Sequence, residues 1–282
     1  MEWLTDNKIP IGTWIDQFVT FLNMHAAWAF DIISDTLNFL IDGLVDVMLW
    51  VHPLVLLAIF AGITWWLHRS WKLVALVVPS LLLVINLGYW DETVQTLALV
   101  VCATLICTVV GIPIGIAAAH RPWLYTAIRP ILDLMQTIPT FVYLIPTLVL
   151  FGLGMVPGLI STIIFAIPAP IRLTYLGVSS VPQQLLDAGE AFGATPRQQL
   201  WKVEIPYAMP TIMAGLTQCI MLSLSMVVIA ALVGAESLGT PVLRALSTMN
   251  LVMGFEAGLA IVILAILLDR ICKQPGGRPT RY

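Results

Sequence analysis

The chain has 282 residues and a formal net charge of −3; hydrophobic residues make up 59% of it and charged residues only 10%. Soluble domains carry about 25% charged residues, so this balance excludes a soluble protein. The small negative charge also argues against nucleic acid as a partner. The four cysteines are scattered, with neither metal-ligand spacing nor a disulfide framework. The composition indicates an integral membrane protein.

The N-terminal segment, residues 1–51, contains a predicted amphipathic helix near residues 28–48. One stripe of this helix is polar and consists of Asp31, Asp35, Asn38, Asp42 and Asp46. Four carboxylates are too costly in a lipid-facing span, so we expect an extracellular helix that lies flat in the membrane interface or packs against the spans. Two uses of the stripe stay open: a solvated face on a scaffold helix, or a docking surface for an extracellular partner.

The membrane domain follows over residues 52–271, and a cytoplasmic tail is expected over 272–282. An apolar stretch of roughly 20 residues is long enough to cross about 30 Å of hydrocarbon. About seven such stretches are predicted, at 52–67, 72–89, 92–118, 130–152, 154–178, 208–234 and 253–271. The first two are separated by a tight turn, which predicts a helical hairpin. The predicted fold class is therefore all-α and polytopic.

The distribution of basic residues predicts the orientation. Arg69, Arg121, Arg197 and Arg278 follow the first, third, fifth and seventh stretches, so an odd count places them all on one side. Acidic residues at 91, 92 and 236 and the acidic N-terminus gather on the other side. Because cytoplasmic loops are enriched in Lys and Arg, we expect the C-terminus inside the cell and the N-terminus outside.

The longest loop, residues 180–206, is predicted to be cytoplasmic and to form two short helices. Ser180 to Gln183 fits one capping box, and Thr195 to Gln198 fits another. We expect Gly193 to end the first helix at a positive φ. We expect the second helix to end before Pro206, because the residue before proline avoids the α region. Such an element suits a groove on a soluble partner; the alternative is an amphipathic loop resting on headgroups.

Polar residues inside the spans are candidates for lining a pathway. Asp133 is expected to pair with Arg129 one helical turn away. Other polar side chains approximate one face of the 130–152 span or lie on the 208–234 span. These pathway candidates are Gln136, Thr137, Thr140, Tyr143, Ser223 and Ser225.

The 180–206 loop resembles the coupling motif of ABC importer permeases, which reads E-A-A, three residues, G, nine residues, I-x-L-P. Both spacings are kept, with Asp for Glu, Gly for the second Ala, Val for Ile and Ile for Leu. The resemblance assigns ATPase coupling to Asp187, Ala188, Gly189, Glu190, Gly193, Val203, Ile205 and Pro206. Further stretches at 87–91, 130–139 and 233–239 resemble the glycine betaine/proline branch of this family.

This resemblance implies a type I ABC importer membrane domain, a non-catalytic subunit of an ATP-driven importer for glycine betaine or a related quaternary ammonium osmoprotectant. It implies that two copies of the permease form a homodimer in the bacterial cell membrane, in contact with membrane lipid. It also implies two ABC ATPase subunits, which bind ATP and Mg, and an extracellular substrate-binding protein. No cofactor or metal is expected in this chain.

Three alternatives bear on this interpretation. Choline, carnitine or proline stays open as the substrate, since selectivity can reside in the binding protein. An ion-coupled secondary transporter predicts two inverted halves, and none are evident. An intramembrane enzyme is disfavoured because no His-Glu-x-x-His or Gly-x-Ser-x-Gly motif occurs.

Overall fold

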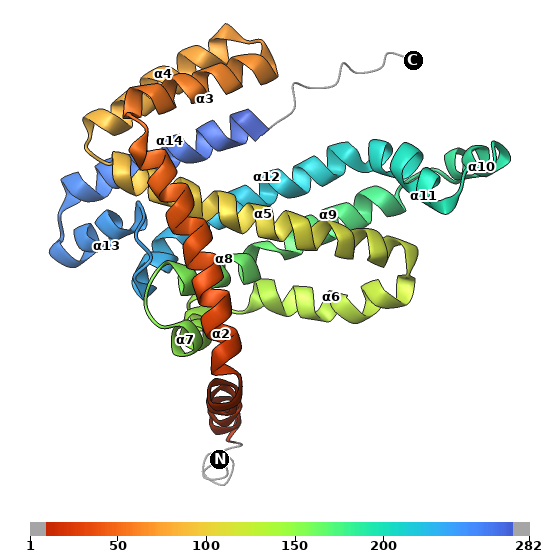
Figure 1. Cartoon of the computed structure of the whole chain (residues 1–282), viewed down its shortest axis with the longest axis horizontal. Coiled ribbons are helices and arrows are strands. Elements are labelled where there is room, and N and C mark those ends of the chain that lie inside the picture. The colour runs from red at the N-terminus through yellow and green to blue at the C-terminus, as the bar shows by residue number, and fades with distance from the viewer. Residues whose placement is uncertain (1–9, 273–282) are drawn as a thin grey trace, which may run out of the picture.

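The computed structural model describes residues 10–272, and all regular elements in this range are helical (Figure 1). The helices before the long loop are α2 (Ile11–Trp50), α3 (Pro53–His68), α4 (Trp71–Asn86), α5 (Trp90–His120), α6 (Pro122–Thr137), α7 (Thr140–Phe151), α8 (Met155–Ala166) and α9 (Pro168–Ser179). Those that follow are α10 (Gln183–Ala191), α11 (Pro196–Gln199), the π-helix η1 (Leu200–Glu204), α12 (Ile205–Ala230), the 3-10 helix η2 (Ala231–Val233), α13 (Gly239–Thr248) and α14 (Leu251–Cys272).

The centre of the molecule is a bundle in which α5, α8, α9 and α12 pack together. Small residues let these helices approach closely, as is typical of membrane helices. A Cβ atom added to Gly115 of α5 would lie 2.7 Å from the carbonyl oxygen of Ile171 and 2.7 Å from Cβ of Thr174 in α9. The bundle therefore depends on the absence of a side chain at Gly115.

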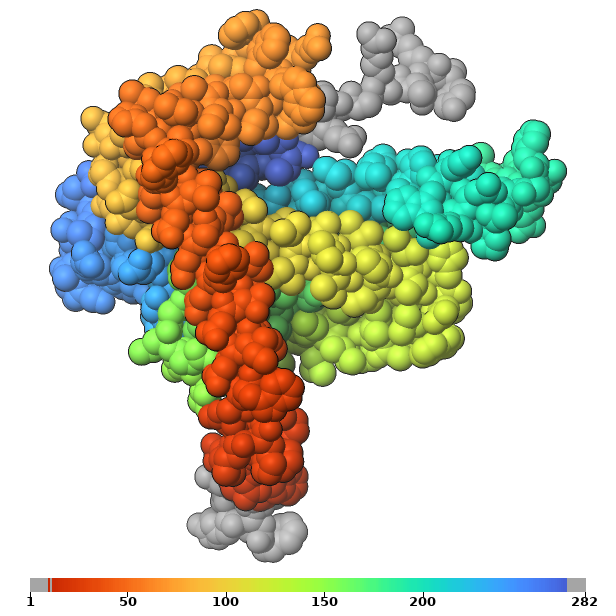
Figure 2. Space-filling model, viewed as in Figure 1, coloured from red at the N-terminus to blue at the C-terminus, as the bar shows by residue number. Residues whose placement is uncertain are grey.

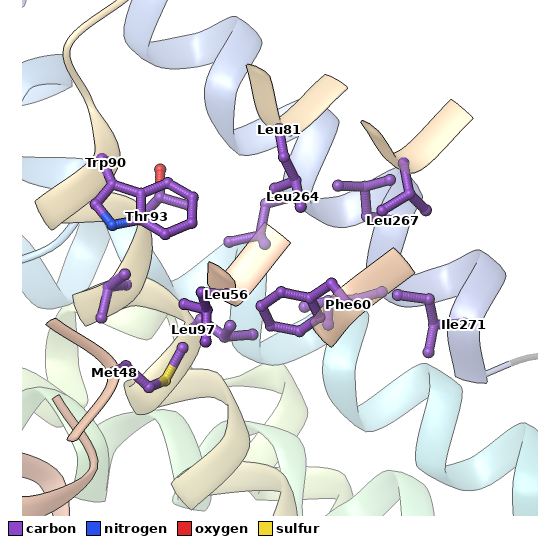
Figure 3. Close-up of a pocket in the computed structure, with 13 residues that line it drawn as sticks. Met48, Leu56, Phe60, Leu81, Trp90, Thr93, Leu97, Leu264, Leu267 and Ile271 are labelled. Atoms are coloured by element: carbon purple, nitrogen blue, oxygen red, sulfur yellow. The ribbon is translucent and has the colours of Figure 1, made fainter. Parts of the chain in front are cut away.

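A second apolar layer joins the α3–α4 hairpin to α5 and α14. Figure 3 shows Leu56 of α3, Leu81 of α4, Leu97 of α5 and Leu264 of α14 around one small apolar cavity. Apart from Thr93 its lining is wholly hydrophobic. The hairpin is thus held to the bundle by apolar packing, and α3 and α4 form the predicted antiparallel pair.

Four segments in the described range are long and apolar enough to cross a membrane: Trp90–His120, Met155–Ser179, Pro196–Val233 and Leu251–Cys272. Two bent pairs, α2 with α3 and α6 with α7, raise the number to six if each pair is one span. The α3 and α4 helices have 16 residues each. At a rise of roughly 1.5 Å per residue each is about 24 Å long, shorter than the hydrocarbon layer. The predicted count of about seven spans is therefore approximate.

The predicted span over 130–152 is not one continuous helix. The α6 helix ends at Thr137, α7 begins at Thr140, and the two are bent by 98°. Pro139 supplies no backbone N–H, and Ile138 before it is extended, with ψ of 131°. The hydroxyl of Tyr143 donates to the backbone carbonyl oxygens of Leu134 and Met135 at the end of α6. The contact with Met135 stabilises the bend, because the residue four positions after Met135 is Pro139, which has no N–H to donate; the Leu134 carbonyl oxygen also accepts the Ile138 N–H.

The N-terminal helix α2 is longer than the predicted 28–48 helix and runs across the bundle (Figure 1). Ile41 is fully buried and packs with Ala103 of α5 and Leu159 of α8. The carboxylates of the predicted stripe (Asp31, Asp35, Asp42 and Asp46) are all exposed. The N-terminal half of α2 extends beyond the bundle (Figure 2).

Candidate functional site

The long loop between α9 and α12 forms a projection at one end of the molecule (Figures 1 and 2). Its first helix, α10, begins after Pro182. The prediction that Ser180 is the N-cap is wrong, because α9 continues to Ser179 and the Ser180 hydroxyl donates to the carbonyl oxygen of Gly177 at 2.9 Å. Ser180 therefore belongs to the end of the preceding helix.

Gly193 has a φ of +74°, and the predicted left-handed turn is confirmed. Its backbone N–H donates to the Glu190 carbonyl oxygen at 2.8 Å. The Ala194 N–H donates to the Gly189 carbonyl oxygen at 3.0 Å. These two bonds make a complete Schellman motif, which satisfies the last carbonyls of α10 and reverses the chain.

The predicted second capping box is also present. The Gln198 backbone N–H donates to the Thr195 hydroxyl at 3.3 Å, and the Thr195 N–H donates to the Gln198 side chain at 2.9 Å. The expected stop before Pro206 is wrong. The chain continues through a π-helical turn into α12, and Pro206 lies in the first turn of α12. Pro206 has no N–H to donate, and it directly follows the change of hydrogen-bond register at which the Ile205 N–H donates to the Leu200 carbonyl oxygen.

Residues 180–206, which resemble the coupling motif and are called the coupling element below, are held together by contacts between their two halves. The Gln199 side-chain amide donates to the Leu186 carbonyl oxygen at 3.4 Å. A Cβ atom added at Gly189 would lie 3.8 Å from Val203, so this glycine packs on the π-helical turn. The matched motif residues that remain exposed are Asp187, Ala188, Glu190, Gly193 and Pro206. The exposed residues leave a protruding surface free for a partner.

Two aromatic side chains on this surface were missed by the sequence analysis. Phe192, next to Gly193 in the turn, is 93% exposed, and Trp201 is 61% exposed. Large aromatic residues often anchor protein interfaces. A phenylalanine beside the turn glycine of a long polar loop was an available signal, because nothing else in that loop requires it.

An ion-pair contact joins the coupling element to α5. Nε2 of His120, the last residue of α5, lies 2.8 Å from Oε2 of Glu204 in the π-helical turn. Nδ1 of His120 lies 2.9 Å from the carbonyl oxygen of Ile116. Glu204 is buried, so this contact belongs to the packing between the projection and the end of α5.

Charged residues join α6 to α9. Nη2 of Arg172 lies 2.7 Å from Oδ1 of Asp133, and Nε of Arg129 lies 4.0 Å from Oδ2 of the same carboxylate. The expected pairing of Asp133 with Arg129 is present at the limit of an ion pair. The closer partner, Arg172, comes from another helix and was not predicted. Nearby, the rings of Tyr125 and Tyr175 stack at 3.6 Å.

The predicted pathway residues fall in different surroundings. Gln136 and Thr137 are exposed at the end of α6, and Thr140 begins α7 after the bend. Tyr143 is buried and bonds across the bend, so the four residues do not share one helical face. On α12, Ser223 is buried, whereas Ser225 is exposed and donates to the Met221 carbonyl oxygen. Their role in lining a pathway stays a prediction.

The opposite end of the bundle is acidic. Asp91, Glu92 and Glu236 line a hollow of about 230 Å³, and the Gln95 side chain donates to Glu236 at 2.8 Å. Burial, together with the nearby carboxylates of Glu256 and Glu92, raises the pKa of Tyr89. The acidic residues that the sequence assigned to one side thus lie at the end away from the coupling element (Figure 1).

Comparison with known proteins identifies the family. Residues 111–272 match the family described as the inner membrane component of binding-protein-dependent transport systems. The chain belongs to this family. This permease is 47% identical to the glycine betaine transport system permease protein OpuAB of Bacillus subtilis, over 95% of this chain and 94% of the relative. It is 43% identical to the glycine betaine/proline betaine permease ProW of Escherichia coli, over 97% of this chain and 77% of the relative.

A solved structure supports the architecture. The permease resembles a chain of the inward-facing MetNI methionine ABC transporter with a TM-score of 0.57 and 26% identity, covering 68% of this chain and 93% of that chain. The permease is therefore a non-catalytic, multi-pass subunit of an ABC transporter in the cell membrane. It works with ATP-hydrolysing subunits and a substrate-binding protein, and its family implies no cofactor in the chain itself.

Proposed function

We propose that this permease imports glycine betaine. The whole-chain similarity to the Bacillus and Escherichia relatives supports this substrate, since it covers nearly all of the described helices. A relative from Listeria monocytogenes, 44% identical, is a glycine betaine/carnitine permease. Choline, carnitine and proline are therefore the competing substrates in the test below.

The coupling element carries the mechanistic part of the proposal. A rigid projection, closed by the Schellman motif at Gly193 and the capping box at Thr195, docks into a groove of the ATPase subunit. Phe192 and the exposed motif residues make the contact. The ATPase binds ATP and Mg, and its closure moves the projection. The His120–Glu204 contact passes this movement to α5, and the continuous chain from Pro196 to Val233 passes it to α12.

The proposed assembly contains two permease copies, two ATPase subunits and one extracellular binding protein. The coupling element then lies in the cytoplasm, and the acidic hollow at Glu236 faces outside. The polar stripe of α2 faces the outer water, because its carboxylates are exposed and lie away from the face that buries Ile41. This arrangement agrees with the positive-inside rule.

Transport by the reconstituted complex tests the substrate and the energy source. Liposomes containing the permease, its ATPase and its binding protein should accumulate glycine betaine only when ATP is supplied. The permease alone should hydrolyse no ATP. Uptake that follows a sodium or proton gradient without ATP contradicts the proposal, and faster uptake of choline, carnitine or proline than of glycine betaine contradicts the substrate.

Cysteine labelling tests the orientation. Asp35→Cys should react with an impermeant thiol reagent in intact cells. Ile41→Cys, buried against α5 and α8, is the matched control and should react poorly. Leu40 is a weaker control, since its side chain is 51% exposed. If the Asp35→Cys variant is protected in intact cells and labelled only after the membrane is opened, α2 lies on the inner side.

A further inference from the structure

The contact between α6 and α9 is made by charged groups inside two apolar segments: Arg172 lies in the candidate span Met155–Ser179, and Asp133 lies in the bent pair of α6 and α7, which is long enough to span only if the two helices are taken together. At roughly 1.5 Å per residue, Asp133 lies about 16 Å along α6 from Pro122, and Arg172 lies about 10 Å along α9 from Ser179. The start of α6 and the end of α9 both lie at the end of the bundle that carries the coupling element (Figure 1). Ionisable groups this far along membrane helices are expensive to keep and mark functional sites by default.

These charged side chains are open to their surroundings. The exposed fractions are 68% for Arg129, 53% for Asp133 and 33% for Arg172. A surface of this kind cannot face lipid, because charged side chains are unstable in hydrocarbon. The bend after α6 leads to the same conclusion. Non-helical backbone within a membrane is tolerated only where it is buried inside the protein or lines a water-filled cavity. The charged face of α6 therefore borders a water-filled space or the second permease copy.

The group carries more positive charge than it can pair. Within the described residues, Asp133 is the one carboxylate within 4 Å of either guanidinium. Two guanidinium groups present ten N–H donors, whereas one carboxylate offers two oxygens. Arg129 is the less satisfied arginine, since its contact with Asp133 is 4.0 Å long. A second carboxylate would complete the pairing, and guanidinium groups bind carboxylates in a two-point geometry.

We propose that Arg129, Asp133 and Arg172 form a substrate site for a small zwitterion in the inner half of the transport pathway. The carboxylate of the substrate pairs with Arg129, and its quaternary ammonium group lies near Asp133. The net charge of +1 on the group repels a cation that lacks a carboxylate, such as choline. The site therefore adds a selection step within the membrane domain. This inference rests on the proposed import of glycine betaine.

A purely structural ion pair is the competing explanation. The Tyr125–Tyr175 stack also joins α6 to α9, so the two helices do not depend on the ion pair alone. Figure 1 shows α6 on the side of the bundle away from α3 and α4, and the free half of α2 extends toward that side. A second permease copy on this side would enclose the charged face of α6 between the two copies, where the transport pathway would run.

Uptake by the complete reconstituted complex tests the site. Arg129→Gln should lower ATP-driven glycine betaine uptake at least tenfold, and Arg129→Lys should recover part of it. Arg244→Gln, which removes an exposed arginine near the outer end, is the matched control and should transport normally. Wild-type uptake by Arg129→Gln overturns the site while leaving the proposed function intact. Failure of the unaltered complex to import glycine betaine contradicts the proposed function itself.

A charge exchange separates a substrate site from a structural pair. The double variant Asp133→Arg with Arg172→Asp rebuilds an ion pair between the helices but reverses its direction. We expect this double variant to be defective in glycine betaine uptake, although its ion pair is rebuilt. Normal uptake by the double variant would mean that Asp133 and Arg172 form a structural ion pair only, and it would overturn the proposal.

A labelling experiment decides the matter if these variants fail to assemble. Thr126→Cys places a thiol one turn from Arg129 without altering any charge. Millimolar glycine betaine should slow its reaction with an anionic thiol reagent, and choline should not. The complex without this substitution reports the background from native cysteines. Equal reaction rates with and without glycine betaine overturn the proposal.

Discussion

Gly115 and Gly193 illustrate how differently the bundle and the coupling element are specified. Gly115 is required by its neighbours, since a side chain there would collide with Ile171 and Thr174 of α9. Gly193 is required by its own backbone, which has a φ of +74° while nothing lies within 4 Å of an added Cβ. The bundle therefore depends on tertiary packing and the coupling element on local geometry. A change in one should be separable from a change in the other.

The largest effect is expected for Gly115→Val. Overpacking of a well-packed interior typically costs about 1–3 kcal/mol, and a close backbone approach raises the cost. We expect most of the variant to aggregate when it is extracted in detergent, as measured by size-exclusion chromatography. Gly62→Val in α3 is the control, because an added Cβ there meets nothing within 4 Å. Equal recovery of the two variants would contradict the close contact between α5 and α9.

A smaller loss of stability is expected for Tyr143→Phe. The substitution removes the hydroxyl donor of the Met135 carbonyl oxygen at the end of α6, whereas the Leu134 carbonyl oxygen keeps the Ile138 N–H. Loss of a buried hydrogen-bond partner costs about 1–3 kcal/mol, so the melting temperature in detergent should fall. Tyr207→Phe, at a side chain that is 45% exposed, should leave it unchanged. An unchanged melting temperature in Tyr143→Phe would show that the bend does not need this bond.

The smallest effect on stability is expected at the contact between the bundle and the coupling element. Glu204→Gln keeps the shape of the side chain but removes the charge that lies 2.8 Å from Nε2 of His120. We expect normal insertion and a several-fold lower ratio of glycine betaine imported to ATP hydrolysed. Lys202→Gln, an exposed neighbour in the same turn, should keep the normal ratio. An unaltered ratio in Glu204→Gln would mean that α5 is not driven through this contact.

Local signals explain why the coupling element was largely predictable. The turn glycine and the Thr195–Gln198 capping box act over three to five residues, so the printed sequence contains the whole interaction. The errors at its borders arose where two local signals competed. Ser180 fits an N-cap, but the preceding helix, α9, extends to Ser179, so Ser180 lies at the end of α9. Pro206 predicts the end of a helix, but the chain enters α12 through the π-helical turn that precedes Pro206.

Contacts between distant segments explain what was missed elsewhere. Proline is tolerated inside membrane helices, so Pro139 alone did not distinguish a kink from a 98° bend. The Tyr143 hydroxyl contacts the end of α6 across the bend, and a sequence does not show where that hydroxyl points. Asp133 pairs most closely with Arg172, 39 residues away, and a sequence offers no spacing rule at that distance. Helix existence was therefore predictable, whereas the charged face of α6 was not.

The most direct test of the account compares two substitutions at Gly193. Valine strains the left-handed turn by about 1–2 kcal/mol, whereas asparagine tolerates this conformation. Both variants should reach the membrane in wild-type amounts, because the turn lies outside the bundle. The account predicts that Gly193→Val loses substrate-stimulated ATP hydrolysis and uptake in the reconstituted complex, while Gly193→Asn retains most of both. Normal coupled uptake in Gly193→Val would contradict the assignment of residues 180–206 as the coupling element.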